Sequence, residues 1–147
     1  MVLIHAMLMK QSQTQLNIDC RGRGMTKITY QIQQWVKEQG IQTGLLTVFV
    51  QHTSCSLMIQ ENADPDVLTD METFMSKLIQ DGDPDFKHVD EGIDDMSAHI
   101  RMALTQVSLT IPVTNGQATL GVWQGVYLYE HRFAPMRRRV LLHVMGE

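Results

Sequence analysis

Apolar residues recur at helical spacing in three parts of the chain. The first pattern follows Thr26, which offers an N-cap, and it stops at Gly40. The second begins at Asp64-Pro65, an N-cap followed by proline at the first helical position. The third follows Asp94 and Asp95, either of which can cap a helix. The buried stripe predicted for the second helix consists of Val67, Leu68, Met71, Phe74, Met75 and Leu78.

Runs of β-branched and apolar residues predict strands elsewhere. Residues from about 8 to 18 predict one or two short strands, which end at the turn-prone segment 21–24. Residues 45–50 are apolar at every position except one, which predicts a central strand buried on both faces. Asn115-Gly116 predicts a hairpin. The other strand-like runs are 56–60, 107–113, 117–122, 125–130 and 139–144.

This order of elements, with helices in the first two thirds and consecutive strands at the end, predicts an α+β fold in a single domain over residues 1–147. Residues 1–9 form an N-terminal extension or the lead-in to the first strand. They lack the charge order and cleavage site of a signal peptide, and they are too short to span a bilayer. Neither a dinucleotide-binding glycine motif nor a Walker sequence is present.

The composition and charge of the chain limit the classes of partner and the cellular location that we expect. The chain is 44% hydrophobic and 19% charged, as in globular proteins, and its net charge of −4 argues against nucleic acid or an anionic membrane as a partner. The two cysteines, Cys20 and Cys55, form no disulfide framework, which fits a reducing, cytoplasmic location.

The densest group of ionisable side chains lies between His88 and His99, a short segment with two imidazoles and four carboxylates. His99 stands one helical turn after Asp95, at i, i+4, whereas His88 lies in the preceding loop. A loop ligand and a helix ligand that meet at one point can form a metal or phosphate site. The alternative is that the carboxylates only stabilise the helix N-terminus, whose exposed N–H groups favour negative charge.

His52, which follows the predicted strand 45–50, is a third candidate ligand. With His88 and His99 it would supply three neutral imidazoles and leave a coordination position open, an arrangement that suits zinc or a similar ion. Each histidine taken alone is more often a hydrogen-bonded structural group. A nucleophilic Cys55 with His52 as its base is a weaker alternative, because free cysteine is usually a small buried hydrophobe.

Two further segments contain candidate site residues. Glu61, Asn62 and Asp64 stand at the start of the second predicted helix, where Asp64 also has a structural role as N-cap. Trp123 lies between two glycines and could stack a flat heterocycle or fill the core. The arginine run 137–139 could bind phosphate or could be a solvated strand entry.

The order of several uncommon motifs resembles the YjbQ family, small proteins whose members have been described as a secondary thiamine-phosphate synthase. The resemblance covers residues from about 15 to 147. Cys55 stands where family members often carry Ala, and Val122 replaces the usual Thr of a Gly-Thr-Trp-Gln motif. The shared motifs are His52-Thr53-Ser54, Glu61-Asn62-Ala63-Asp64-Pro65, Asp70-Met71-Glu72, His88 to Gly92, Asp94 to Ile100, Ser108 to Pro112, Gly121 to Val126, Glu130-His131-Arg132, Arg138-Arg139 and Gly146-Glu147.

The resemblance implies a folded, mostly antiparallel, sandwich-like sheet with about three helices, and a homotrimer with sites near subunit contacts. It implies a reaction that joins a hydroxymethylpyrimidine diphosphate to a thiazole phosphate and releases pyrophosphate. The histidines and carboxylates add the expectation of a divalent ion, zinc or magnesium, at the site. A metal-dependent hydrolase of a phosphorylated or acyl metabolite and a non-catalytic metabolite-binding trimer are the alternatives. The expected site comprises His52, His88 and His99 as metal ligands or acid/base groups, Glu61, Asn62, Asp64 and Glu91 as their acidic and amide partners, Trp123 and Gln124 as a wall, and Arg132 as a phosphate ligand.

Overall fold

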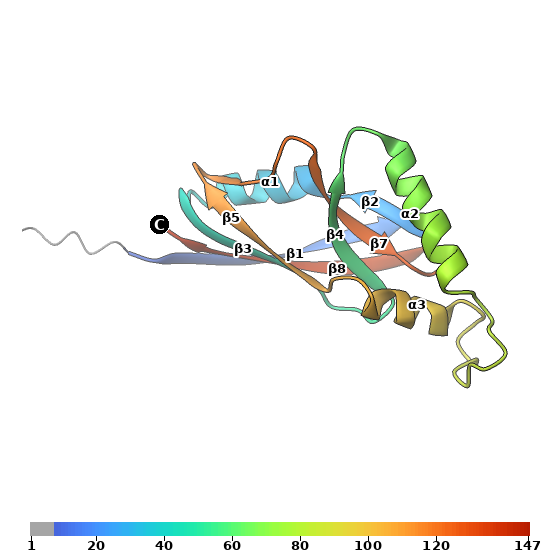
Figure 1. Ribbon diagram of the computed structural model, residues 1–147. Helices are drawn as coiled ribbons and strands as arrows, with labels where there is room; N and C mark the ends of the chain where they lie inside the picture. Colours follow the sequence, from blue (N-terminus) through green and yellow to red (C-terminus); the bar gives the residue numbers. More distant parts are fainter. Residues whose placement is uncertain (1–7) are drawn as a thin grey trace, which may run out of the picture.

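The computed structural model describes residues 8–147, in which eight strands form two antiparallel sheets (Figure 1). Three helices accompany them: α1 (Thr29–Glu38), α2 (Pro65–Leu78) and α3 (Asp95–Ala103). These observations confirm the predicted α+β class. The larger sheet has the strand order β1 (Lys10–Cys20), β8 (Met136–Gly146), β3 (Thr43–Val50), β5 (Ser108–Thr114) and β6 (Gln117–Ala118), and the smaller one the order β2 (Gly24–Lys27), β7 (Gln124–Glu130) and β4 (Cys55–Glu61).

The core lies on one side of the five-stranded sheet, where α1 and the three-stranded sheet cover it (Figure 1). Alternate residues of the central strands, among them Leu46 on β3 and Leu142 on β8, point to this side and are fully buried. Ile32 of α1 meets them and is also fully buried. Because successive strand residues point to opposite faces, one face of each strand provides most of the apolar core.

The opposite face of this sheet remains open within residues 8–147, which corrects the prediction that residues 45–50 are buried on both sides. The strand is central in the sheet, but Leu45 is 48% and Phe49 39% exposed. Leu45 pairs across the strands with Met145, which is 41% exposed, and Phe49 pairs with Leu141. An apolar strip therefore runs along the outer face of β3 and β8.

The predicted helix starts are correct at α2 and wrong at α1. The Asp64 carboxylate accepts the Asp66 N–H at 2.9 Å, as an N-cap should. Thr26, by contrast, belongs to β2, where it pairs with Leu128, so α1 begins only at Thr29 and without a side-chain cap. Strand pairing with β7 outweighs the capping preference of Thr26.

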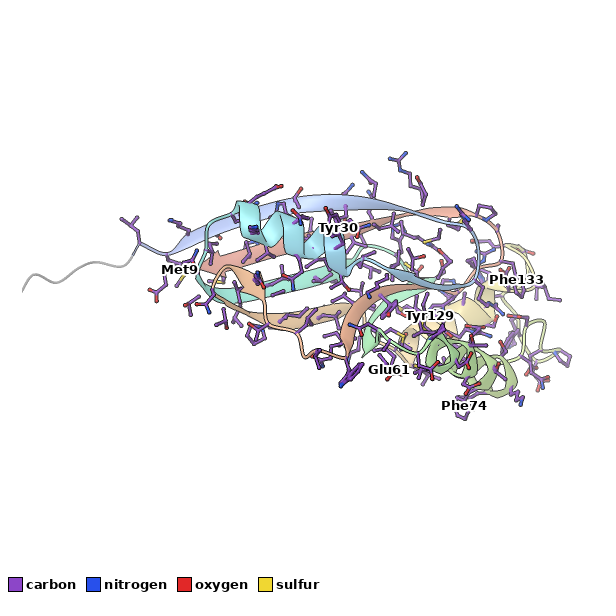
Figure 2. All side chains as sticks on the ribbon, turned by 90° about the horizontal axis from the view of Figure 1, so that it is seen from above. Met9, Tyr30, Glu61, Phe74, Tyr129 and Phe133 are labelled. Atoms are coloured by element: carbon purple, nitrogen blue, oxygen red, sulfur yellow. The ribbon has the colours of Figure 1, made fainter. Side chains whose placement is uncertain are left out.

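Helix α2 is attached loosely to the rest of the protein. None of its residues is fully buried, and Phe74 and Leu78 of the predicted buried stripe are 64% and 57% exposed. Phe74 lies on the outer side of the helix (Figure 2). The stripe was therefore predicted too wide: Val67, Leu68, Met71 and Met75 are partly buried, and the other two residues face outward.

The hairpin at residues 115–116 is as predicted, whereas two strands differ from the prediction in length. Asn115 and Gly116 have φ values of 51° and 74° and form the predicted hairpin between β5 and β6. The run 117–122 forms a strand only over Gln117–Ala118, and residues 10–20 form a single long strand. None of the helices in residues 8–147 is long and apolar enough to cross a membrane.

Candidate metal centre

The loop that follows α2 and the first turn of α3 bring His88, Asp95 and His99 together. Oδ2 of Asp95 lies 2.7 Å from Nε2 of His88 and 3.2 Å from Nε2 of His99. These three atoms all lie within 4.8 Å of one another. The Asp95 side chain is only 2% exposed, whereas those of His88 and His99 are 43% and 33% exposed. The cluster thus has a buried carboxylate at its base and two imidazoles open to solvent.

The hydrogen bonds among the three side chains of the cluster all converge on one oxygen, Oδ2 of Asp95. Nδ1 of His99 contacts the Thr53 carbonyl oxygen at 2.8 Å, an acceptor, so this nitrogen carries a proton. Nε2 of the same ring then needs a second proton to donate to Asp95, and Nε2 of His88 needs one as well. A cation bound between these nitrogens and the carboxylate would satisfy the same three atoms without those protons.

Arg132 and Asp94 support the carboxylate from behind. The Arg132 guanidinium forms an ion pair with Oδ1 of Asp95 and donates to the Glu91 carbonyl oxygen at 2.7 Å. Asp94 accepts the Phe133 N–H at 2.7 Å and forms no cap bond to α3, although it occupies the N-cap position. Burial opposes ionisation of Asp95, but the hydrogen bond from His88 and the charges of Arg132 and His99 outweigh it, so the pKa of Asp95 lies below its usual value.

A second set of contacts ties the loop to the body of the protein. Arg23, between β1 and β2, forms two hydrogen bonds of 2.7 and 2.8 Å with the carboxylate of Asp81. Ser97 of α3 donates to the same carboxylate. The guanidinium of Arg23 also lies 4.0 Å from the ring centre of Phe133. The loop between α2 and α3 is therefore anchored at its beginning as well as at Asp95.

His52, predicted as the third ligand, lies outside this cluster. Its Nε2 accepts the Arg139 backbone N–H at 2.8 Å, and its Nδ1 lies 3.5 Å from the Arg138 guanidinium. Burial, Arg138 and Arg139 lower the pKa of His52, which keeps the ring neutral. Its lone pair is therefore used within the protein, and the segment contributes the Thr53 carbonyl to the cluster instead of an imidazole.

Four other predicted site residues, Glu61, Asn62, Trp123 and Gln124, lie at the far end of the three-stranded sheet. Cys55 and Glu61 are the ends of β4, which at about 3.3 Å per residue places them roughly 20 Å apart. Figure 2 shows Glu61 well separated from Phe133, the residue that binds Asp94. One chain does not bring these residues to the histidine cluster.

At that far end, Asn62 fixes the loop that carries Trp123. Its amide group donates to the carbonyl oxygens of Val122 at 3.2 Å and Gln124 at 3.1 Å. The Gln124 side chain in turn accepts the Gly121 N–H at 2.7 Å. Trp123 is 63% exposed, so it is displayed on the surface instead of filling the core. The amides of Asn62 and Gln124 are thus engaged in holding the loop.

The remaining candidate residues make contacts that maintain the fold. Asp64 caps α2, and Glu91 offers its backbone carbonyl to Arg132. Cys55 is fully buried, and burial raises the pKa of its thiol to about 12, which is incompatible with a thiolate nucleophile. Sequence reasoning did not select Asp95 as a ligand, although its i, i+4 relation to His99 was the signal that could have identified it.

Comparison with known proteins identifies the relatives of this chain. The UPF0047 protein YjbQ-like family profile matches residues 14–147. A UPF0047 protein of Synechocystis sp. is 51% identical over 138 residues, which cover 94% of each chain. UPF0047 protein YjbQ of Escherichia coli O157:H7 is 38% identical over 136 residues, which cover 92% of this chain and 98% of its own.

Solved structures agree with the architecture described above. A conserved hypothetical protein from Thermus thermophilus is 32% identical, with a TM-score of 0.79 over 88% of this chain and 97% of its own. A protein of unknown function from Sulfolobus solfataricus is 24% identical and shares the fold, with a TM-score of 0.83 over 95% of this chain and 100% of its own. The chain belongs to the YjbQ-like UPF0047 family.

Proposed function

We propose that His88, Asp95 and His99 bind a divalent metal ion and that the protein is a metal-dependent enzyme acting on a small phosphorylated metabolite. The observation that carries this proposal is the approach of two imidazole nitrogens and one buried carboxylate oxygen to within 4.8 Å. The donor set favours zinc or a similar transition metal over magnesium, because magnesium prefers oxygen ligands and retains its waters. The exposed sides of the two imidazoles leave room for water or substrate.

The residues of the chain would orient these ligands. Thr53 holds Nδ1 of His99 and so turns Nε2 of that ring toward the ion. Arg132 occupies Oδ1 of Asp95 and leaves Oδ2 for coordination. A bound ion would neutralise charge on a phosphoryl oxygen or lower the pKa of a bound water.

The family resemblance supplies the first candidate reaction, the joining of a hydroxymethylpyrimidine diphosphate to a thiazole phosphate with release of pyrophosphate. Departure of pyrophosphate requires neutralisation of its growing negative charge, which a divalent ion at this cluster would provide. The reaction also needs two anionic substrates beside the same ion.

The charges near the cluster support a second candidate, hydrolysis of a single phosphorylated or acyl metabolite. Residues 81–95 contain seven carboxylates and one lysine. The nearby arginines already bind carboxylates: Arg23 binds Asp81, Arg101 binds Glu72 and Arg132 binds Asp95. A hydrolase places only one anionic substrate beside this acidic loop. The electrostatic repulsion between substrate and protein is therefore smaller than for a synthase with two anionic substrates.

The proposal extends to the assembly and location of the protein. The open apolar strip on β3 and β8 supports self-association, and the resemblance specifies a homotrimer. Both cysteines are free and buried, which suits a cytoplasmic protein. The net charge of −4 argues against nucleic acid and anionic membranes as partners.

Elemental analysis of the natively purified protein tests the proposal. Wild type and Asp90→Asn, which changes an exposed carboxylate of the same loop, should carry stoichiometric zinc or a related metal. Asp95→Asn and His99→Ala should lose it while circular dichroism shows an unchanged fold. A wild-type protein that neither contains nor takes up a divalent ion would refute the metal centre.

Turnover assays with the metal-loaded protein separate the candidate functions. Pyrophosphate release only when both precursors are present identifies a synthase, whereas release of phosphate or acid from one substrate identifies a hydrolase. Binding without turnover would identify the non-catalytic metabolite-binding alternative. In the two catalytic cases, Asp95→Asn should abolish activity and Asp90→Asn should retain it.

A further inference from the structure

The loop between α2 and α3 lines a half-open hollow of about 360 Å³ beside the histidine cluster. The lining is mostly apolar and includes Pro84, Phe86, Val89 and Ile93, and the ring of His88 forms part of its wall. Val89 and Ile93 are 62% and 66% exposed, a large apolar area for so short a loop. The volume lies at the lower end of the range for small-molecule sites and suits a ligand of one or two rings.

The loop that forms this hollow is closed and anchored. Its two ends meet where the Gly82 N–H donates to the Ile93 carbonyl oxygen at 3.0 Å. Gly82 has a φ of 67°, in the left-handed region that glycine adopts most readily, and a Cβ there would displace the end of the Ile93 side chain. The Phe86 N–H donates to the Asp83 carbonyl oxygen at 3.0 Å inside the loop. A closed loop with its own internal contacts can present a preformed binding surface.

Charge defines the chemistry of the ligand. Asp83 lines the hollow, Asp85, Asp90 and Glu91 belong to the same loop, and Lys87 is the one lysine or arginine of residues 79–94. An anionic group in the hollow would be repelled, whereas a neutral or cationic ring would keep both the apolar contact and a favourable field.

We propose that this hollow binds the flat, neutral or cationic ring of a small molecule, and that any anionic group of the same molecule points out of the hollow toward the metal centre. The orientation rests on the proposed function, but binding of the ring does not, because side chains of the loop itself line the hollow. The ring would lie against Phe86 and Val89, next to His88. The loop would then select the substrate by its uncharged or positive end.

Nuclear magnetic resonance titrations of the full chain with benzylamine, benzyl alcohol and benzoate test this inference, because the three probes share a ring and differ in charge. Benzylamine and benzyl alcohol should shift the amide signals of residues 82–93 and the methyl signals of Val89 and Ile93, with dissociation constants in roughly the millimolar range for so small a ligand. Benzoate should bind more weakly. Absence of saturable shifts with benzylamine and benzyl alcohol, or equal binding of benzoate, would overturn the proposal.

A matched pair of variants locates the site. Val89→Gln removes an apolar contact from the hollow and should weaken binding of benzyl alcohol by roughly three- to tenfold. Val122→Gln changes an equally small residue, 80% exposed, at the far end of the protein and should leave binding unchanged. Equal effects of the two variants would show that the probe binds elsewhere.

Repeating the titration with metal-free Asp95→Asn separates this inference from the proposed function. Ring binding that persists in this variant supports the hollow as an independent site, whatever the metal analysis shows. A metal-loaded wild type that fails to bind the ring would overturn the hollow while leaving the metal centre intact.

Discussion

Replacement of Glu72 by Gln should destabilise the protein strongly, because this carboxylate joins the loosely attached α2 to the core. Its Oε1 accepts from Arg101 at 2.8 Å and from Ser76 at 2.9 Å, and its Oε2 accepts the Tyr129 hydroxyl. Figure 2 shows Tyr129 beside this helix. The Arg101 side chain is 0% exposed and Glu72 is 26% exposed. The buried guanidinium is therefore paired directly with the Glu72 carboxylate, and its charge also acts on Asp81.

The magnitude follows from the burial of the two partners. Breaking a fully buried ion pair costs about 3–5 kcal/mol, mainly because one charge remains buried without compensation. Since Glu72 is partly exposed, water can reach the site, and we expect a loss of about 2–4 kcal/mol. The loss is a large part of the stability of an ordinary domain, about 5–15 kcal/mol.

The effect should depend on pH in a defined direction. Burial opposes ionisation of Glu72, but the hydrogen bonds from Tyr129, Arg101 and Ser76 outweigh it, and the pKa of Glu72 lies below its usual value. A depressed carboxyl pKa contributes stability above the unfolded pKa, about 4.3, and that stability is lost as the pH falls through the folded pKa. The gap between wild type and variant should be constant from about pH 6 to 8 and should narrow below about pH 4.

Urea unfolding followed by circular dichroism measures this gap, and a double-mutant cycle with Arg101→Met identifies its cause. Arg101→Met leaves a partly exposed carboxylate that keeps Tyr129 and Ser76, so it should cost less than Glu72→Gln. The double variant should resemble Arg101→Met, because no buried charge remains to be compensated. Additive losses, or a gap of less than about 1 kcal/mol at neutral pH, would refute the reasoning.

Further predictions concern other parts of the protein. Arg132→Gln should weaken zinc affinity by about 10–100-fold in competition with a chelating dye, because Asp95 loses its positioning partner; unchanged affinity would contradict this role. Phe49→Glu should shift sedimentation toward the monomer, because it places a charge in the apolar strip, and an unaltered oligomer would argue against that interface. Asn62→Ala should accelerate amide hydrogen exchange in residues 121–124, whose loop it holds, while exchange in α3 stays as in wild type. Cys55 should resist iodoacetamide at pH 8 in the native state and react after unfolding, because burial raises its pKa to about 12.

Local patterns were sufficient for most of the fold because they act over a few residues. Proline after Asp64 and Asn-Gly at 115–116 predict a helix start and a turn from adjacent residues alone, and both were correctly located. Tertiary pairing decided the places where local reasoning failed. Thr26 had a capping side chain but lies in a strand paired with β7, and the width of the buried stripe on α2 depended on how far the helix sits from the sheet.

The candidate site was predictable only where its ligands are neighbours in sequence. Asp95 and His99 are one helical turn apart, and His88 belongs to the loop that enters the same helix, so their meeting follows from local geometry. His52 and Trp123 belong to two motifs of the same family, but they lie near opposite ends of the paired strands β4 and β7. The order of motifs along the sequence does not indicate at which end of a strand pair each motif lies. The register of β4 on β7 resolves this: it places Cys55 opposite Glu130, on the side of Arg132 and Asp95, and Glu61 opposite Gln124. A pairing shifted or reversed would have produced a different combination of the same motifs, so the site is a consequence of strand register as much as of residue type.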